Sequence, residues 1–164
     1  MSTIDKVKET LSKINYACMA TVNQDGSPHN SPLVFLYDEN FEYIYWGSHP
    51  DALHSQNVLR TGQTYFAAYD AIGGGPGVYI QAEQAAIVSE VELDEALRVH
   101  NHFRSKLGKK SIEKAYYAVD MPQKMWKAKV VTVWTNDFER DANGRLQKDF
   151  KIKIELNELQ EMWQ

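Results

Sequence analysis

The chain has 164 residues, of which 43% are hydrophobic and 24% charged, a composition typical of a globular protein with a sizeable core. A formal net charge of −4 excludes a general electrostatic attraction to nucleic acids or anionic membranes. No apolar run approaches the roughly 20 residues of a membrane-spanning helix, and the lone Cys18 excludes an intrachain disulfide or a cysteine metal cluster. The first residues lack the apolar core and cleavage site of a secretion signal, so we expect a cytoplasmic protein.

The N-terminal part of the chain changes from a helical to a strand-like pattern. Apolar residues at helical spacing predict an amphipathic helix over residues 3–14, with Thr3 as its cap. A short strand at 17–22 follows, and a second strand is predicted at 29–37. The Asp25-Gly26 pair between them is typical of a tight β-hairpin turn.

Pro32 lies inside the predicted strand 29–37, where it cannot donate a backbone hydrogen bond. Its position therefore predicts a sheet edge, a bulge or a bound ligand at this point of the strand. A polar turn then leads to an aromatic strand at 41–46, which completes a meander of antiparallel strands.

The next stretch reads as a strand followed by a short helix. Ser48 is a candidate helix cap, Pro50 suits the first helical turn, and Gly62 can end the helix. A helix start offers free N–H groups and a positive dipole end to an anion. His54 and Asn57 add polar side chains on one helix face. Most Ser-capped helices bind nothing, so this pattern alone also fits a purely structural helix.

The rest of the chain continues the mainly β pattern. Further strands are predicted at 64–69, 78–88 with a bulge near Glu83-Gln84, 127–134 and 146–156. Further helices are predicted at 93–107, in part of the polar segment 108–126, and at 158–163. The glycine-rich run 73–77 matches neither a Rossmann nor a P-loop pattern and is expected to be a flexible connection. His100 and His102 are two apart on a helix and point in different directions, so we expect no metal site.

The predicted fold is a mainly β, six- to seven-stranded antiparallel split β-barrel with appended helices, in a single domain over residues 1–164. Several segments, in this order, resemble the pyridoxamine 5′-phosphate oxidase-like FMN-binding split barrels, of the general-stress type rather than the true oxidases. The segments are Met19–Val22, Asp25–His29, Ser31–Phe35, His54–Val58, Val78–Ala82 and Val133–Asn136.

This resemblance implies a homodimer with FMN in clefts between the subunits. Ser31, Pro32, Leu33 and Val34 would lie along the isoalloxazine ring. The ribityl-phosphate end would be at Gly47 and Ser48, and the phosphate would be held by His54 and Asn57. Trp134 of the facing subunit would cover part of the flavin, or else serve core or dimer packing.

The chain departs from the oxidases at the basic positions around the phosphate. The matching positions hold Ser31, Leu36, Leu53 and His54, of which only His54 can bring a positive charge. The arginine- and histidine-containing stretch that grips the vitamin phosphate corresponds here to residues 146–150, Leu-Gln-Lys-Asp-Phe. We therefore expect that pyridoxamine phosphate is not the substrate.

Two functions follow from the resemblance. The first is an FMN-dependent oxidoreductase acting on a small molecule with a small-molecule electron donor. The second is a non-enzymatic flavin-binding or stress-related protein, with haem or a deazaflavin as alternative ligands of the same barrel. The sequence identifies no catalytic acid or base, although His49 lies beside the expected site.

Overall fold

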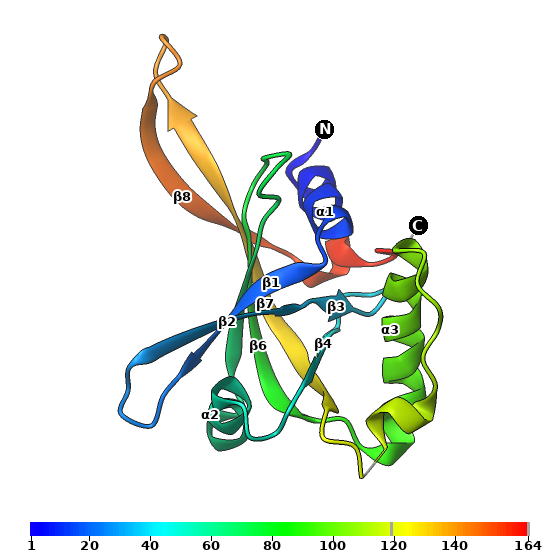
Figure 1. Ribbon diagram of the computed structural model, residues 1–164. Helices are drawn as coiled ribbons and strands as arrows, with labels where there is room; N and C mark the ends of the chain where they lie inside the picture. Colours follow the sequence, from blue (N-terminus) through cyan, green and yellow to red (C-terminus); the bar gives the residue numbers. More distant parts are fainter. Residues whose placement is uncertain (119, 164) are drawn as a thin grey trace.

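The computed structural model describes residues 1–118 and 120–163, and the strands of this part of the chain form one antiparallel sheet. Its strands are β1 (Tyr16–Val22), β2 (Pro28–Val34), β3 (Leu36–Tyr37), β4 (Tyr43–Ser48), β5 (Thr64–Ala68), β6 (Val78–Ile87), β7 (Lys124–Arg140) and β8 (Leu146–Ile154). They run in the order β2-β1-β5-β6-β7-β4-β3, with β8 paired to β7. The sheet curls until β2 approaches β4 without pairing to it (Figure 1). The split antiparallel barrel is therefore confirmed.

The predicted strand 29–37 is divided at Phe35, which explains why there is one strand more than expected. β2 pairs with β1, whereas β3 pairs with β4, so the chain changes neighbours at this point. The Phe35 N–H donates to the carbonyl of Asn15 at 3.0 Å instead of to a ladder partner. Pro32 lies in β2, which is the end strand of the path, so the edge interpretation is confirmed.

The other strand predictions hold with shifted ends. The aromatic strand 41–46 is β4 at 43–48, because Phe41 adopts a positive φ of 55° in the preceding turn. The predicted bulge in β6 is confirmed by a register shift between Glu83 and Ala86. β7 is longer than the predicted 127–134 because residues 124–126 pair with β4 and residues 135–140 pair with β8.

Three α-helices flank the sheet: α1 (Thr3–Lys13), α2 (Leu53–Thr61) and α3 (Leu93–Lys106). The predicted cap of α1 is wrong by one residue, since Ser2 accepts from the Asp5 N–H and Asp5 bonds back in a capping box. Gly62 ends α2 in the left-handed conformation at φ 65°, as predicted. α3 covers β3 and β4 with its apolar face (Figure 1).

Three short 3-10 turns complete the described elements: η1 (Glu90–Glu92), η2 (Lys114–Tyr117) and η3 (Leu156–Leu159). η2 is all that forms of the helix predicted within 108–126, of which residue 119 lies outside the described part. The predicted helix 158–163 is wrong, because the chain is extended at Gln160 after η3. There Trp163 stacks on His102 at 4.0 Å and donates its indole N–H to the Tyr37 carbonyl at 3.2 Å.

The barrel interior is filled by aromatic side chains. Trp46 and Trp126, which face each other across β4 and β7, are fully buried and stacked at 6.2 Å. Phe66 packs edge-on against Trp46 at 5.8 Å. The Trp126 indole donates to the Ser48 carbonyl at 3.1 Å, whereas the Trp46 indole N–H has no partner in the described chain.

The outer half of β7 and the part of β8 paired with it extend away from the barrel as a two-stranded arm, whereas Ile154 at the end of β8 is buried in the core (Figure 1). Beyond Thr135, β7 pairs only with β8 among the described strands. Within residues 1–118 and 120–163, no helix is long and apolar enough to cross a membrane.

Candidate functional site

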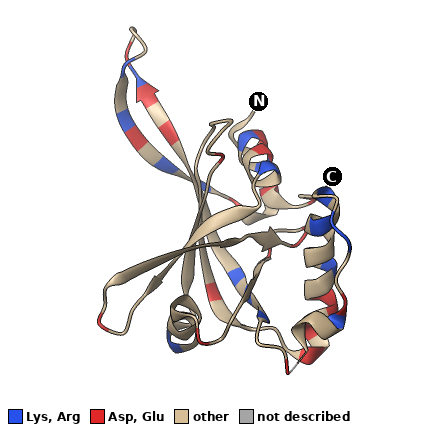
Figure 2. Cartoon of the chain, in the orientation of Figure 1, with Lys and Arg blue, Asp and Glu red and all other residues tan. Residues whose placement is uncertain are grey.

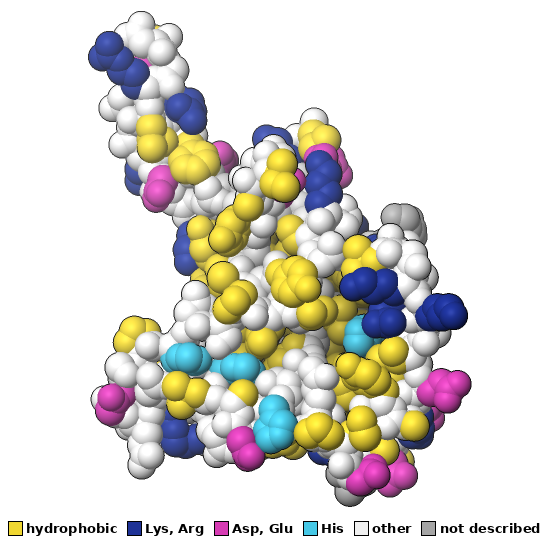
Figure 3. Space-filling model, in the orientation of Figure 1, with side chains coloured by type: hydrophobic (Ala, Val, Ile, Leu, Met, Phe, Trp, Pro, Cys, Tyr) yellow, Lys and Arg dark blue, Asp and Glu magenta, His cyan; other side chains and the backbone are white. Residues whose placement is uncertain are grey.

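Polar side chains from β2, β4 and α2 meet beside the sheet edge. On β2, the His29 Nε2 and the Ser31 Oγ share a hydrogen bond of 3.0 Å. On the other side, the Ser48 Oγ and the His54 Nε2 share one of 2.7 Å. The two histidines are electrostatic neighbours, and Figure 3 shows histidine side chains gathered where β2 and α2 lie. We call His29, Ser31, Ser48 and His54 the histidine-serine cluster.

The protonation of His54 follows from its surroundings. Partial burial lowers the pKa of His54, and the neighbouring His29 lowers it further. The Ser48 Oγ accepts from the Ser55 hydroxyl at 3.1 Å, and its own proton has two acceptors in reach, the His49 carbonyl at 3.3 Å and the His54 Nε2 at 2.7 Å. Before any anion binds, the cluster therefore offers hydroxyl and imidazole groups as hydrogen-bond donors.

The predicted capping role of Ser48 is wrong. Ser48 remains in β4, opposite Lys124, and its carbonyl accepts the Trp126 indole N–H. Pro50 lies in the turn before the helix, and the N-cap position is Ala52, which makes no side-chain cap. The first N–H groups of α2 therefore lack a side-chain acceptor, and they lie next to His54.

Asn57 is directed away from the histidine-serine cluster. Its buried amide group donates to the Thr21 Oγ1 at 3.1 Å and to the Asn23 Oδ1 at 2.8 Å. These two bonds use both hydrogens of the amide and fasten α2 to the β1–β2 hairpin. The role of Asn57 in this chain is to position α2.

We expect Asn57→Ala to lower the free energy of unfolding by about 1 to 3 kcal/mol, because it leaves buried oxygens of Thr21 and Asn23 unpaired. Urea unfolding followed by circular dichroism measures this loss. Asn30→Ala, at an exposed position of β2, is the matched control and should change stability by less than about 0.5 kcal/mol. Equal losses in the two variants would contradict this role of Asn57.

The other predicted residues occupy different surroundings. On β2, Leu33 packs against the core, whereas Pro32 and Val34 are exposed. Leu53 is half exposed at the first turn of α2. These residues lie on β2 and α2, the strand and the helix that also carry His29, Ser31 and His54.

Trp134 is separated from β2 by the width of the sheet. A register row runs from Pro32 through Cys18, Ala67 and Tyr79 to Trp134, all on the outer face. Four strand spacings correspond to about 19 Å along the sheet. On this face Trp134 stacks with Tyr65 at 6.2 Å, and it is only partly buried, so it is not a core residue.

The outer face around this row has few charges. β1, β2 and β5 contain no Lys, Arg, Asp or Glu, whereas the arm, α1 and α3 are rich in them (Figure 2). Lys151 of the arm lies over this face, with its ammonium 4.1 Å from the Tyr79 ring and bonded to the Tyr65 hydroxyl at 3.0 Å. A sparsely charged, partly aromatic sheet face is typical of a surface that another protein covers.

The sequence of the chain matches a known family over most of its length. The profile of the family described as "Pyridoxamine 5'-phosphate oxidase" matches residues 3–137. The chain belongs to this family. Comparison with curated proteins gives no match.

Several solved structures have a similar fold. An F420 reductase has a TM-score of 0.57 at 14% identity, covering 77% of this chain and 94% of that one. A haem-binding protein from Mycobacterium smegmatis has a TM-score of 0.66 at 16% identity, covering 98% of this chain and 62% of that one. General Stress Protein 26 from Bacillus anthracis has a TM-score of 0.59 at 11% identity, covering 82% and 94%. At these identities the likeness is one of fold.

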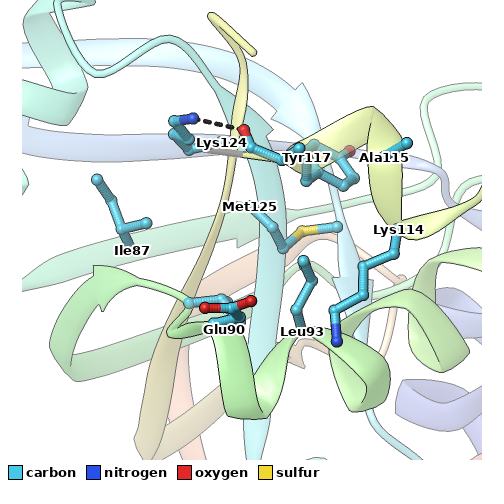
Figure 4. A pocket seen from close by; sticks show the side chains of 10 residues that line it. Ile87, Glu90, Leu93, Lys114, Ala115, Tyr117, Lys124 and Met125 are labelled. Carbon is cyan, nitrogen blue, oxygen red and sulfur yellow. Dashed lines mark hydrogen bonds between the residues drawn. The ribbon is translucent and has the colours of Figure 1, made fainter. Parts of the chain in front are cut away.

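Gly47 precedes Ser48 of the histidine-serine cluster and lies beside a cavity on the side of Tyr117. A Cβ at Gly47 would lie 3.0 Å from the Tyr117 hydroxyl, so a side chain there would displace that tyrosine. Tyr117 forms a wall of a largely apolar pocket of about 360 Å³. Figure 4 shows Leu93 and Met125 within this pocket and the hydrogen bond from Lys124 to the Ala118 carbonyl, which is 2.8 Å long.

His100 connects Tyr117 to α3 and carries a strongly shifted pKa. Its Nδ1 shares a hydrogen bond of 3.2 Å with the Tyr117 hydroxyl. Burial, together with the charges of Arg104 and Lys109, lowers the pKa of His100 to about 4. His100 is therefore neutral in the folded protein at pH 7.

This pKa predicts a loss of stability in mild acid. Above pH 6.5 His100 is neutral in both states; between pH 6.5 and 4 only the unfolded chain takes up the proton, so unfolding becomes easier. We expect the Tm to fall over this range, and to fall less steeply in His100→Gln, which cannot titrate. Thermal denaturation in a pH series measures both slopes. Identical slopes would assign the acid sensitivity to other groups.

Sequence reasoning did not select His29. It lies 25 residues before His54 and reaches it only because the sheet curls. The only signal was its place directly after the Asp25-Gly26 hairpin, within a segment that resembles the family.

Proposed function

We propose that this protein binds FMN as a homodimer and acts as an oxidoreductase on a small molecule other than pyridoxamine phosphate. The histidine-serine cluster at the uncapped start of α2 is the observation that carries this proposal. The cluster supplies hydroxyl and imidazole donors, and the helix supplies free N–H groups and a positive dipole end. This donor set fits a phosphate.

The phosphate would be held by His54, Ser48, His29 and Ser31, with Asn57 positioning the helix. The flavin ring would lie along Ser31–Val34, because β2 has no strand on its outer edge and its free backbone groups can meet the polar edge of the ring. Gly47 would border the ribityl chain. The bound flavin would supply hydride or electron transfer, and the protein would orient it.

The homodimer is supported by the position of Trp134. A flavin on β2 cannot be covered by the Trp134 of the same chain, which is about 19 Å away along the sheet. A second copy placed against the outer face of β1, β2 and β5, strands without charged residues, could bring its own Trp134 to that site. The single domain and the cytoplasmic location that the sequence predicts are part of the same proposal.

The test is reconstitution of the purified protein with FMN. We expect saturable binding, a flavin spectrum with bands at roughly 370 and 450 nm, and a dimer in light scattering. Reduction by NADH or NADPH with repeated turnover of an acceptor would support the oxidoreductase, whereas stable FMN without turnover would support a flavin carrier. A protein that binds no FMN at any concentration tested would overturn the proposal.

Haem is the second candidate ligand. It is favoured by two partly exposed imidazoles that are electrostatic neighbours, since histidine is a common axial ligand of haem iron, and by the fold shared with a haem-binding protein. The same spectrum decides between them: a Soret band after mixing with haemin, lost in His54→Ala, would favour haem. A deazaflavin such as F420, which the name of a second structural neighbour suggests, would compete with FMN for the same site.

A further inference from the structure

One lysine fastens the base of the arm to the barrel. Lys151 belongs to β8 and faces Asn136 of β7 across the arm. Its ammonium lies 4.1 Å from the centre of the Tyr79 ring, 5.5 Å from that of Tyr65 and 6.0 Å from that of Trp134. It also donates to the Tyr65 hydroxyl at 3.0 Å. A side chain of the arm therefore reaches β6 and β5, although β8 is paired with β7 in the sheet.

The surroundings of the Lys151 ammonium favour a cation without the help of a carboxylate. Each aromatic ring attracts a positive charge through its π face, and the tyrosine hydroxyl accepts a charge-assisted hydrogen bond. Within residues 1–118 and 120–163, no carboxylate forms an ion pair with Lys151. The rings and the hydroxyl are therefore what holds this side chain on the outer face.

The residue that faces Lys151 makes a second attachment at the same level. The Asn136 Oδ1 accepts the Gly77 backbone N–H at 2.5 Å, and the Thr135 hydroxyl donates to the Gly77 carbonyl at 3.0 Å. A Cβ at Gly77 would lie 3.2 Å from both the Asn136 Oδ1 and the Tyr79 hydroxyl, so a side chain there would be crowded. Both strands of the arm are thus tied to the start of β6.

The contacts at the base determine the direction of the whole arm. Beyond Thr135, β7 pairs only with β8 among the described strands, and the ribbon extends away from the barrel (Figure 1). A two-stranded ribbon without a third neighbour receives no support along its length. Its direction therefore depends on the side chains that hold its base.

We propose that Lys151 and Asn136 form a clasp that holds the arm against the outer face of the barrel and that opens while the barrel stays folded. In the closed state the lysine lies over Tyr65, Tyr79 and Trp134. In the open state the arm moves away and leaves these rings free for solvent or for a second copy of the chain. The clasp thereby couples the direction of the arm to the aromatic surface that the outer face presents. It does not depend on the proposed flavin site.

The test is amide hydrogen exchange of the full-length protein, with all variants at one protein concentration. Lys151→Met keeps the apolar stem but loses the charge and the donor. We expect exchange about tenfold faster at residues 149–153 and 135–137, which corresponds to about 1.4 kcal/mol of clasp opening. The amides of the Trp46–Trp126 layer should exchange at the original rate, because the barrel stays folded.

Three further variants separate the parts of the clasp. Lys148→Met is the matched control, since the Lys148 ammonium lies 5.6 Å from the Phe150 ring within the arm, and it should leave the exchange unchanged. Lys151→Arg keeps a cation and a donor and should stay within about threefold of the original rate. Tyr65→Phe keeps the ring and removes only the hydroxyl, so its exchange should be about threefold faster.

Acrylamide quenching of tryptophan fluorescence provides a second measurement. Trp46 and Trp126 are fully buried, whereas Trp134 is partly exposed beneath Lys151. Quenching should therefore be stronger in Lys151→Met than in Lys148→Met. Circular dichroism verifies that each variant is folded.

Four outcomes would overturn the proposal. Unchanged exchange in Lys151→Met would mean that the contact does not hold the arm. Equal acceleration in Lys151→Met and Lys148→Met would mean that only the charge of the arm matters. Equal acceleration in Lys151→Arg and Lys151→Met would mean that the cation is not what the rings hold. Faster exchange in the Trp46–Trp126 layer as well would mean a general loss of stability instead of a clasp.

Discussion

Replacing His29 and His54 together by alanine should weaken FMN binding about 100-fold. Each imidazole would donate to a phosphate oxygen, and a hydrogen bond to a charged group contributes about 1.5 to 3 kcal/mol. Because both imidazoles are partly exposed to solvent, we expect each bond to contribute the lower of these two energies. Fluorescence quenching of FMN on titration with protein measures the affinity. Because both side chains are only partly buried, we expect the fold to be retained.

His49→Ala is the matched control for this double variant. His49 is exposed and belongs to the same turn, but its Nδ1 accepts the Asp51 N–H at 3.1 Å rather than joining the cluster. We expect its FMN affinity to stay within about threefold of the original, as for a surface change away from the ligand. An equal loss in His49→Ala would place the phosphate at the turn instead of the histidine-serine cluster.

Trp126→Ala should lower the free energy of unfolding by about 3 to 5 kcal/mol, the usual cost of removing a fully buried Trp. The stacking partner Trp46 loses one face, and the Ser48 carbonyl loses its indole donor. A domain of this size has a total stability of roughly 5 to 15 kcal/mol, so the variant should unfold at much lower urea concentration. FMN should restore part of the loss, since Ser48 belongs to the proposed site.

A pair of smaller changes isolates the hydrogen bond within that effect. Trp126→Phe and Trp46→Phe remove similar volumes from the same stack, but only Trp126 donates to a carbonyl. Trp126→Phe should therefore cost about 1 kcal/mol more than Trp46→Phe. Equal costs would show that the bond to Ser48 contributes nothing to stability.

Short-range signals in the sequence predict much of this fold. Gly26 and Gly62 both adopt the positive φ that their turns require, at 84° and 65°. The apolar stripe of α3 is buried as its helical spacing predicts, with Leu93, Val99 and Phe103 in the core. In each case, residues close in sequence determine the local conformation.

The site was predicted less well because long-range pairing determines it. Ser48 has the residue type of a helix cap, but its backbone pairs with Lys124, which lies 76 residues later, and that pairing keeps it in β4. Asn57 lies on the expected helix but points to Thr21 and Asn23, since the curl of the sheet brings the hairpin under α2. The meeting of His29 with His54 has the same origin and could not be read from spacing.

The β7–β8 arm affects where the folded protein unfolds locally. A ribbon of two strands with no third neighbour is only marginally stable in water. Its amide hydrogens should exchange with solvent far faster than those of the Trp46–Trp126 layer, by local fraying that leaves the barrel intact. If a second copy covers the arm, dilution below the dimer dissociation constant would speed up this exchange. The amide exchange rate of the arm would then measure dimer assembly without an added label.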